Sequence, residues 1–341
     1  MYGYLSLYHN RLDCCLLAHT QPSQVGIELS SIAFTTFANG VEIAAVASTS
    51  AFTLSPESTS PLPLAGRLIP QSSENGLAAI SAVFNNFIHG LDSNITVQGA
   101  NAGPSDVCLL SCYIVYIQLK LSVQVTWLNE GIQTLDIATT LPNRGKLNII
   151  ESITLEQLQL LFSDNTAYDP MTSSNATTAA FTLPFNFPID IVSLEQNITV
   201  GYDGQSFAEL VIPNAPCTTD VQARIIHLTF SDVPFAVFGD QHTTFQNFLA
   251  ATTTGGMQTL ALSGAANTAA STAVGVLSLT DIEFAVSSSL EGLQGLISKP
   301  VTVSNLDVNH GYNNYLLIKV DTSLYNPRWV VFILYRNVGT N

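Results

Sequence analysis

The chain has 341 residues, of which 47% are hydrophobic and 10% are charged. This composition is typical of globular proteins that bury a large core, and it excludes an intrinsically disordered chain. The 25 acidic and 10 basic residues give a formal net charge of −15. This balance argues against nucleic-acid binding, because Lys and Arg side chains have to neutralise a phosphate backbone.

Both ends of the chain differ from the rest of it. Residues 1–24 have no counterpart elsewhere, carry Cys14 and Cys15, and lack the pattern of a signal peptide. At the other end, residues 328–341 follow a turn at 325–327 without the pair of strands expected there. We therefore interpret the chain as a gene-model fragment with an unreliable N-terminal segment and an aberrant tail.

Two parts of the chain repeat each other. The repeat unit of about 145 residues has the size of a domain and is much longer than a solenoid repeat. We expect a first unit over residues 25–180 and a C-terminally truncated second unit over residues 181–327. The matching segments are 84–87 with 245–248, 135–138 with 282–285, 152–155 with 305–308, and 168–170 with 325–327.

Residues 107–124 interrupt the first unit. They have no match in the second unit, and they carry Cys108 and Cys112 in an apolar stretch unlike the Ser- and Thr-rich chain around it. Codons for Val107 and Cys108 and for Gln124 fit the two ends of a spliceosomal intron. We interpret the segment as a retained intron read through in frame; the alternative is a genuine β-hairpin inserted at a loop.

Alternating apolar and polar residues dominate both units, as in residues 132–137 and 225–230. Such alternation predicts strands that bury one face, with turn signals rich in Gly, Asn and Asp between them. Because strands do not alternate regularly with helices, the sequence predicts an all-β fold of two tandem antiparallel β-sandwiches, similar to immunoglobulin or fibronectin domains. Residues 158–162 fit a helix and a strand equally well.

Each unit also contains one segment with helical spacing. In the first unit Ser73 is placed to cap an amphipathic helix, and in the second unit Asp240 precedes a segment of similar phase. A helix of this kind either seals the open end of its sandwich or forms a lid that contacts a ligand. The apolar stripes consist of Leu77, Ile80, Phe84, Phe87 and Ile88 in the first unit and of Phe245, Phe248 and Leu249 in the second.

No catalytic or metal-binding constellation is apparent in the sequence. The six histidines have no ligand spacing with Cys or carboxylates, and no nucleophile elbow or phosphate-binding loop is present. We therefore expect no enzymatic activity, no cofactor and no metal site. The sequons at Asn94, Asn175 and Asn197 are candidates for glycosylation. Asn175 is the best placed, because it falls in a predicted polar loop over residues 172–178.

Several strings of residues resemble a known family. They span about residues 27–327, and they are family-specific strings rather than catalytic signatures. The strings are 63–71, 84–87, 127–132, 230–235 and 300–312. On these residues the chain resembles a family of fungal membrane-anchored proteins of poorly defined function, whose tandem domains are similar to the water-stress type of late-embryogenesis-abundant domain.

The resemblance implies a short cytosolic N-terminus, one transmembrane helix and a lumenal array of β-sandwiches at the vacuolar membrane, linked to the control of autophagy. The alternative location is the cell surface or the secreted fraction. Membrane association would depend on an N-terminal transmembrane helix that this sequence lacks.

Related domains are suspected of holding lipid in an apolar groove, so we expect a non-enzymatic module that binds lipid or a protein partner. The alternatives are a purely structural or protein-binding surface module and, third, a hydrolase. The groove candidates are Phe84, Phe87, Ile88, Phe245, Phe248 and Leu249.

Overall fold

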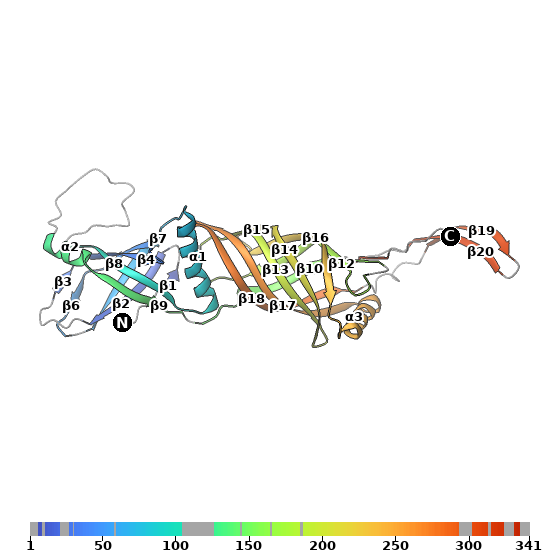
Figure 1. Cartoon of the computed structure of the whole chain (residues 1–341), viewed down its shortest axis with the longest axis horizontal. Coiled ribbons are helices and arrows are strands. Elements are labelled where there is room, and N and C mark those ends of the chain that lie inside the picture. Colours follow the sequence, from blue (N-terminus) through green and yellow to red (C-terminus); the bar gives the residue numbers. More distant parts are fainter. Residues whose placement is uncertain are drawn as a thin grey trace. The chain divides into compact units, whose positions relative to one another are not determined.

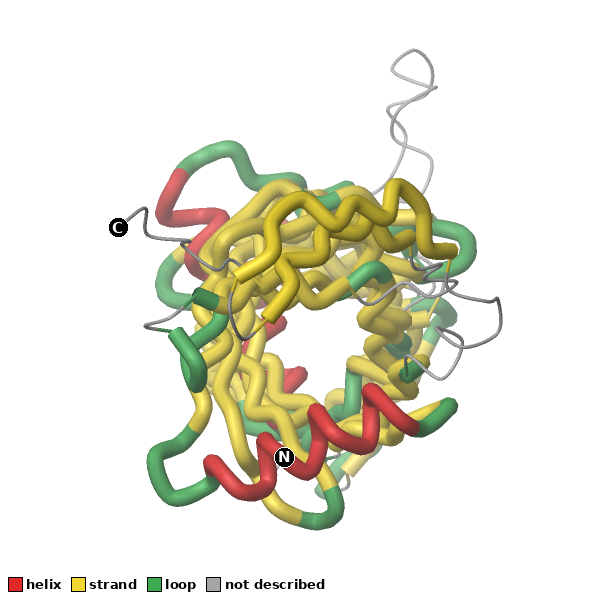
Figure 2. The backbone as a smooth tube through the Cα atoms, turned by 90° about the vertical axis from the view of Figure 1, so that its right-hand side faces the viewer, coloured by secondary structure: helices red, strands yellow, loops and turns green. Residues whose placement is uncertain are grey.

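A computed structural model describes most of the chain. The suspected intron at 107–124 and most of the tail at 328–341 lie outside the described residues. Strands, yellow in Figure 2, make up most of the described backbone, and the predicted all-β fold is confirmed. The described residues are 6–8, 11–20, 27–29, 31–57, 59–103, 126–143, 145–163, 166–184, 187–292, 302–312, 315–323 and 331–334.

The chain divides into two compact units that interleave along the sequence. The first comprises Met1–Ile149, Thr182–Val192 and Asn267–Ile282, and the second comprises Ile150–Phe181, Ser193–Ala266 and Glu283–Asn341. The expected boundary at residue 180 does not coincide with this division. The reason is strand pairing, because residues 150–181 pair with a strand of the second unit rather than with the first sheet.

The first unit is built on a seven-stranded sheet with the order β1-β2-β7-β5-β4-β8-β9, and a short sheet pairs β3 with β6 (Figure 1). Helix α1 packs against β5, β4 and β8, and α2 packs against β8. The elements are β1 (Ser6–Tyr8), β2 (Arg11–Thr20), β3 (Ile27–Leu29), β4 (Ser31–Ala38), β5 (Val41–Ser48), β6 (Phe52–Leu54), β7 (Thr59–Leu68), α1 (Glu74–His89), β8 (Ser93–Gly103), α2 (Thr126–Gln133) and β9 (Asp136–Leu141).

A second large sheet has ten strands. Eight of them follow the order β18-β17-β13-β14-β16-β12-β11-β21, and in addition β10 pairs with β12 and β15 pairs with β16. Strands β11 and β21 run parallel, whereas pairs such as β13–β14 are antiparallel. Strands β19 and β20 form a separate two-stranded sheet.

These elements are β10 (Ile150–Glu156), β11 (Gln159–Phe162), β12 (Met171–Phe181), β13 (Asp190–Tyr202), β14 (Gln205–Pro216), β15 (Thr218–Asp220), β16 (Ile225–Val237), α3 (His242–Thr254), β17 (Met257–Thr272), β18 (Gly275–Glu291), β19 (Thr302–Tyr312), β20 (Tyr315–Ser323) and β21 (Val331–Leu334).

The two large sheets share one topology. The order β7-β5-β4-β8-β9 in the first sheet corresponds to β16-β14-β13-β17-β18 in the second, and a helix follows β7 as well as β16. Two pairs of matching segments fall on corresponding elements, since 84–87 lies on α1 and 245–248 on α3, and 136–138 lies on β9 and 282–285 on β18. The strand order therefore agrees with the tandem repeat inferred from the sequence.

Helix α1 begins where the sequence predicts. Ser73 has extended backbone angles, and its Oγ accepts a hydrogen bond of 3.1 Å from the Gly76 amide. The helix ends at Gly90, whose φ of 76° lies in the left-handed region that favours glycine. Ile80, Phe84 and Ile88 are buried along one stripe of the helix.

Three local features are settled by the described residues. Helix α3 begins at His242 after Gln241, without a side-chain cap. The ambiguous residues 158–162 contain strand β11. The predicted polar loop over 172–178 is wrong, because these residues belong to β12, where Ser and Thr side chains alternate across a strand that pairs with β10 and β16.

Candidate functional site

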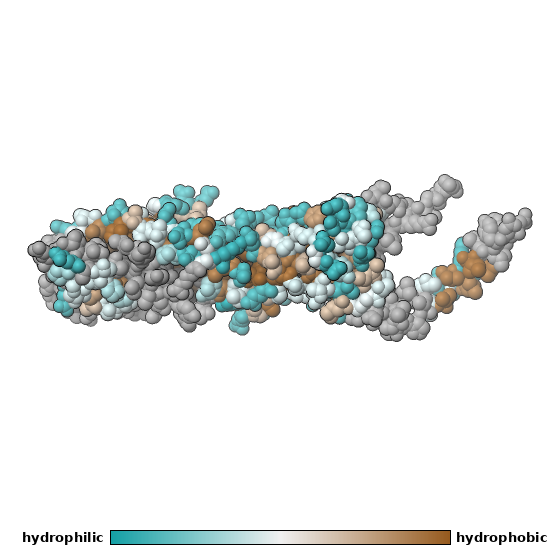
Figure 3. Space-filling view, turned by 90° about the horizontal axis from the view of Figure 1, so that it is seen from below, coloured by the Kyte–Doolittle hydropathy of each residue, from teal (hydrophilic) through white to brown (hydrophobic). Residues whose placement is uncertain are grey.

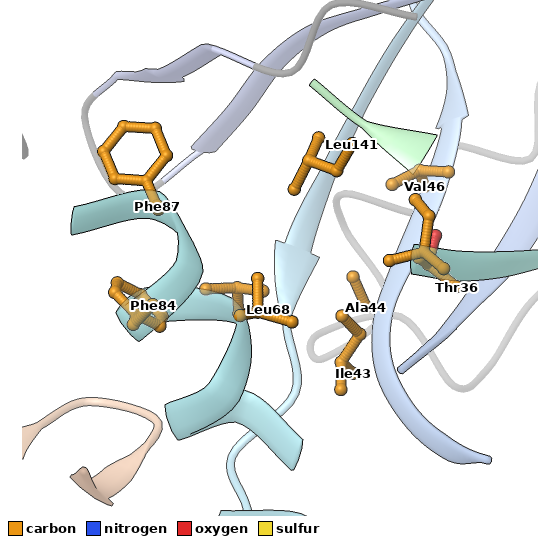
Figure 4. Close-up of a pocket in the computed structure, with 10 residues that line it drawn as sticks. Thr36, Ile43, Ala44, Val46, Leu68, Phe84, Phe87 and Leu141 are labelled. Carbon is orange, nitrogen blue, oxygen red and sulfur yellow. The ribbon is translucent and has the colours of Figure 1, made fainter. Parts of the chain in front are cut away.

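An apolar cavity lies between α1 and the first sheet. Its volume is about 50 Å³, and Thr36 is the one polar residue in its lining. Figure 4 shows Phe84 and Phe87 on the helix and other lining residues, such as Leu68 and Leu141, beside it. The lining residues are Thr36, Ile43, Ala44, Val46, Leu68, Val83, Phe84, Phe87, Ile95 and Leu141.

The size of this cavity limits what it holds in the present conformation. An apolar cavity of about 150 Å³ stays dry and accepts benzene, whereas a space of a few tens of Å³ is enough for only one or two water-sized groups. With about 50 Å³, the cavity is too small for an acyl chain. A larger apolar ligand would enter only if α1 moved away from the sheet.

Two of the three groove candidates on α1 line this cavity. Phe84 is buried and half-buried Phe87 lies one turn further along the helix, and both contribute to the lining. The Phe84 ring also meets Phe187 edge to face, with 6.1 Å between ring centroids. Ile88 is buried but does not line the cavity, so it belongs to the core beneath the helix.

The other face of α1 is held by hydrogen bonds to the β18 backbone. Ser81 Oγ accepts a hydrogen bond of 3.0 Å from the Ser278 amide. Asn85 Oδ1 accepts one of 3.0 Å from the Thr280 amide, and its Nδ2 donates one of 3.0 Å to the Ser278 carbonyl. His89 Nε2 lies 3.0 Å from the Thr280 carbonyl, to which it donates. Because the three residues are four apart, they form one row on the helix.

These bonds connect segments of the first unit that are far apart in sequence, since Asn267–Ile282 belongs to that unit. A main-chain bond from the Gln71 amide to the Val274 carbonyl adds to them just before the helix begins. The helix over the cavity is therefore held on two sides, by apolar contacts beneath it and by polar contacts along its flank.

Helix α3 in the second unit is packed differently. Phe245 and Phe248 are 1% and 2% exposed. Their rings lie 6.0 Å and 5.4 Å from the ring of Phe207, and the cluster also includes Phe235, Tyr202, Phe162 and Tyr168. Leu249 is half-buried. These groove candidates are core residues in this conformation, and a ligand would reach the two rings only if α3 left the aromatic cluster.

The three sequon asparagines lie on strands with their side chains exposed. Asn94 is on β8, Asn175 on β12 and Asn197 on β13. Two shallow polar pockets lie beside Asn94 and Asn175. Asn175 also falls where the register of β12 against β16 shifts, between Ser174 and Thr177. Glycosylation of these residues stays a prediction.

The described residues offer little for catalysis. Among them, no group of His, Cys, Asp and Glu side chains comes together to hold a metal ion. The linings of the apolar cavity and of the two shallow polar pockets contain neither His nor carboxylate residues. Of the helices in the described part of the chain, none has the length and hydrophobicity needed to cross a membrane.

The chain matches no protein-family model and no curated protein. Function therefore has to be argued from the site itself.

The sequence indicated the helix side of the cavity but not its strand side. Ala44, Val46 and Leu68 come from β5 and β7, where apolar alternation marks an inner face without showing which residues border a void. The row formed by Ser81, Asn85 and His89 was also missed. Their spacing of four residues, on the face of the helix next to the apolar stripe, was a usable signal.

Proposed function

We propose that the chain is a non-enzymatic β-sandwich protein that binds the apolar part of a lipid beneath α1 of its first unit. Its setting would be the lumenal face of the vacuolar membrane, as the family resemblance suggests, or alternatively the cell surface. Lipid is the expected partner and no cofactor takes part. The three exposed sequon asparagines are compatible with a lumenal or extracellular setting.

The observation that carries the proposal is the apolar cavity under α1. Ligand sites are typically apolar hollows that are largely formed before the ligand arrives. Here the void lies beneath a single helix, whose Val83, Phe84 and Phe87 form one wall. Each acyl CH₂ group buried there would contribute about 0.8 kcal/mol. Moving α1 would break the polar contacts of Ser81, Asn85 and His89, so binding needs more than one or two such groups.

Native mass spectrometry of the full chain, purified from a eukaryotic secretory host, tests the proposal. We expect a lipid adduct, or uptake of a fatty acid added to the apo protein. Ala44→Leu fills the cavity from β5 and should abolish binding, since Ala44 is 2% exposed and lines the cavity. Ala45→Leu is the matched control, because Ala45 is the exposed neighbour on the same strand.

A folded wild-type chain that stays free of lipid would contradict the proposal. So would equal uptake by the Ala44→Leu and Ala45→Leu variants, because the ligand would then bind elsewhere.

The second candidate is a structural or protein-binding surface module. The closed aromatic cluster around Phe245 and Phe248 favours it, because both side chains are buried in the core and neither is accessible to a ligand. A hydrolase ranks third, since neither the apolar cavity nor the two polar pockets is lined by His or carboxylate residues.

A further inference from the structure

The hairpin of β19 and β20 has one apolar face and one polar face. Val308 pairs with Ile318 on the apolar face, and Asp307 pairs with Lys319 on the polar one. A patch of hydrophobic residues is visible on this hairpin at the right of Figure 3. The exposed fractions on the apolar face are 59% for Val303, 66% for Leu306, 54% for Val308, 54% for Ile318 and 42% for Val320.

An isolated two-stranded hairpin is marginally stable in water, and a contiguous apolar face indicates an interaction surface. In the described part of the chain, β19 and β20 pair only with each other. The alternation along both strands therefore indicates a sheet face that is buried in the functional state.

The sequence repeat allows this face to be compared with the matching strand of the other repeat unit. Segment 152–155 on β10 matches segment 305–308 on β19. Ile153 and Leu155 are 3% and 6% exposed, whereas the matching Leu306 and Val308 are 66% and 54% exposed. Strand β10 pairs with β12, and β12 pairs with the edge of β16, so the buried residues of β10 belong to a large sheet, whereas β19 pairs only with β20 among the described residues.

The first sheet has an edge of the same kind. Residues 62–65 on β7 (Leu-Pro-Leu-Ala) resemble residues 233–236 on β16 (Val-Pro-Phe-Ala), and both strands hold the same place in the strand order. Pro63 pairs with Leu16 of β2, as Pro234 pairs with Met171 of β12. Each edge is thus extended by a strand from earlier in the chain.

The two added strands differ in what lies beyond them. Strand β12 is flanked by β10 and β11 along most of its length. Strand β2 is flanked by β1 only at Arg11–Asp13, and among the described residues no strand pairs with the outer edge of β2 beyond that point. The first sheet therefore has an open edge in the region where the second sheet carries β10.

We propose that copies of this chain associate head to tail, with β19 of one copy pairing along β2 of a second copy. Leu306 and Val308 would then lie on the inner face of the enlarged sheet, as Ile153 and Leu155 do. A second copy is the partner, because the chain's own edge of this type on β16 is already extended by β12 and β10. The contact is heterologous, so it generates open chains of copies rather than closed dimers. It is independent of lipid binding.

Sedimentation velocity of the full chain over a wide concentration range tests this proposal. We expect an average mass that keeps rising with concentration. The double variant Leu306→Lys/Val308→Lys should weaken association at least about tenfold, because it would place charges on a buried sheet face. Val211→Lys is the matched control, since Val211 is 50% exposed on β14 and lies outside the proposed contact; it should associate like the wild type.

Mixing the double variant with the wild-type chain distinguishes head-to-tail assembly from face-to-face pairing of two hairpins. The double variant keeps the β2 edge, so in excess it should cap wild-type chains and lower their average mass. If two hairpins paired face to face, the mass would instead level off at a dimer and the variant would not alter wild-type assemblies. That result, or a monomer at every concentration, would overturn the proposal.

Discussion

Two glycines at corresponding positions of the repeat show how closely other backbone segments approach the strands. A Cβ added at Gly264 would collide with the carbonyl oxygen of Asn197, and one added at Gly99 would collide with that of Ile132. In both units a glycine on the strand after the helix allows another backbone segment to come close. The absence of a side chain at these positions is therefore part of the packing in each sheet.

We expect Gly264→Ala to lower the free energy of unfolding by about 1–3 kcal/mol, because backbone atoms have to shift to admit the methyl group. Gly239→Ala is the control, since a Cβ at Gly239 would meet nothing within 4 Å. Denaturant unfolding of both variants measures the difference. Equal stability of the two variants would contradict the close approach.

Gln196 is a second residue with a measurable consequence. It is 5% exposed on β13, and its Oε1 has no hydrogen-bond partner. A buried unsatisfied acceptor costs about 1–3 kcal/mol, so Gln196→Met should raise the free energy of unfolding by about 1 kcal/mol. Gln196→Glu should lower it, because a buried charge is less favourable still. A loss of stability in the Met variant would mean that the amide has a partner, such as a buried water molecule.

At the scale of elements, α1 and α3 occupy equivalent places in the repeat but are fixed in different ways. Helix α1 lies over a void and is hydrogen-bonded to β18 along its flank. Helix α3 fills its unit with the rings of Phe245 and Phe248. The first arrangement permits movement at the expense of a few polar contacts, whereas the second would require a ring cluster to come apart.

Asn85→Ala removes two of the bonds between α1 and β18. We expect faster amide hydrogen exchange along α1, corresponding to a local opening free energy lower by about 1–2 kcal/mol, with β4 and β5 unaffected. Asn75→Ala at an exposed position near the start of the same helix is the control. Unchanged exchange in α1 would show that these bonds do not hold the helix.

The two helices should also differ in how they tolerate truncation of an aromatic ring. Phe245→Ala should cost about 3–5 kcal/mol of stability, as expected for a fully buried ring. Phe87→Ala should cost clearly less, because Phe87 is half-buried and borders a void. Thermal or denaturant unfolding gives both values, and a larger loss for Phe87 would reverse the assignment of core and cavity wall.

At the scale of the whole molecule, each unit is assembled from three separate stretches of the chain. A single cut therefore does not release either unit intact. A fragment of residues 25–180 would lack Thr182–Val192 and Asn267–Ile282, which belong to the first unit, and would leave β12 without β16.

We expect this fragment to be unfolded or aggregated, as judged by circular dichroism and amide dispersion in NMR spectra. The full chain, expressed and purified in the same way, is the control. A soluble 25–180 fragment with dispersed amide signals would instead support the boundary expected from the sequence repeat.

The sequence by itself determined the features that depend on local pattern. Alternation predicted the strands, and Ser73 marked the start of α1, because capping depends on neighbouring residues. Repetition located α1 and α3 at equivalent positions. The stripe on α1 also identified Phe84 and Phe87, which do line the cavity.

Only the tertiary structure decided what depends on pairing between distant strands. It placed residues 172–178 in β12 although their composition is that of a loop, because β10 and β16 satisfy the backbone on both sides. It distinguished α1, which borders a cavity, from α3, which closes a core. The sequence did not distinguish them, because the apolar stripes of both helices have similar spacing. The interleaving of the units also depends on pairing between distant strands, because the residue spacing within one segment does not show which strand it pairs with.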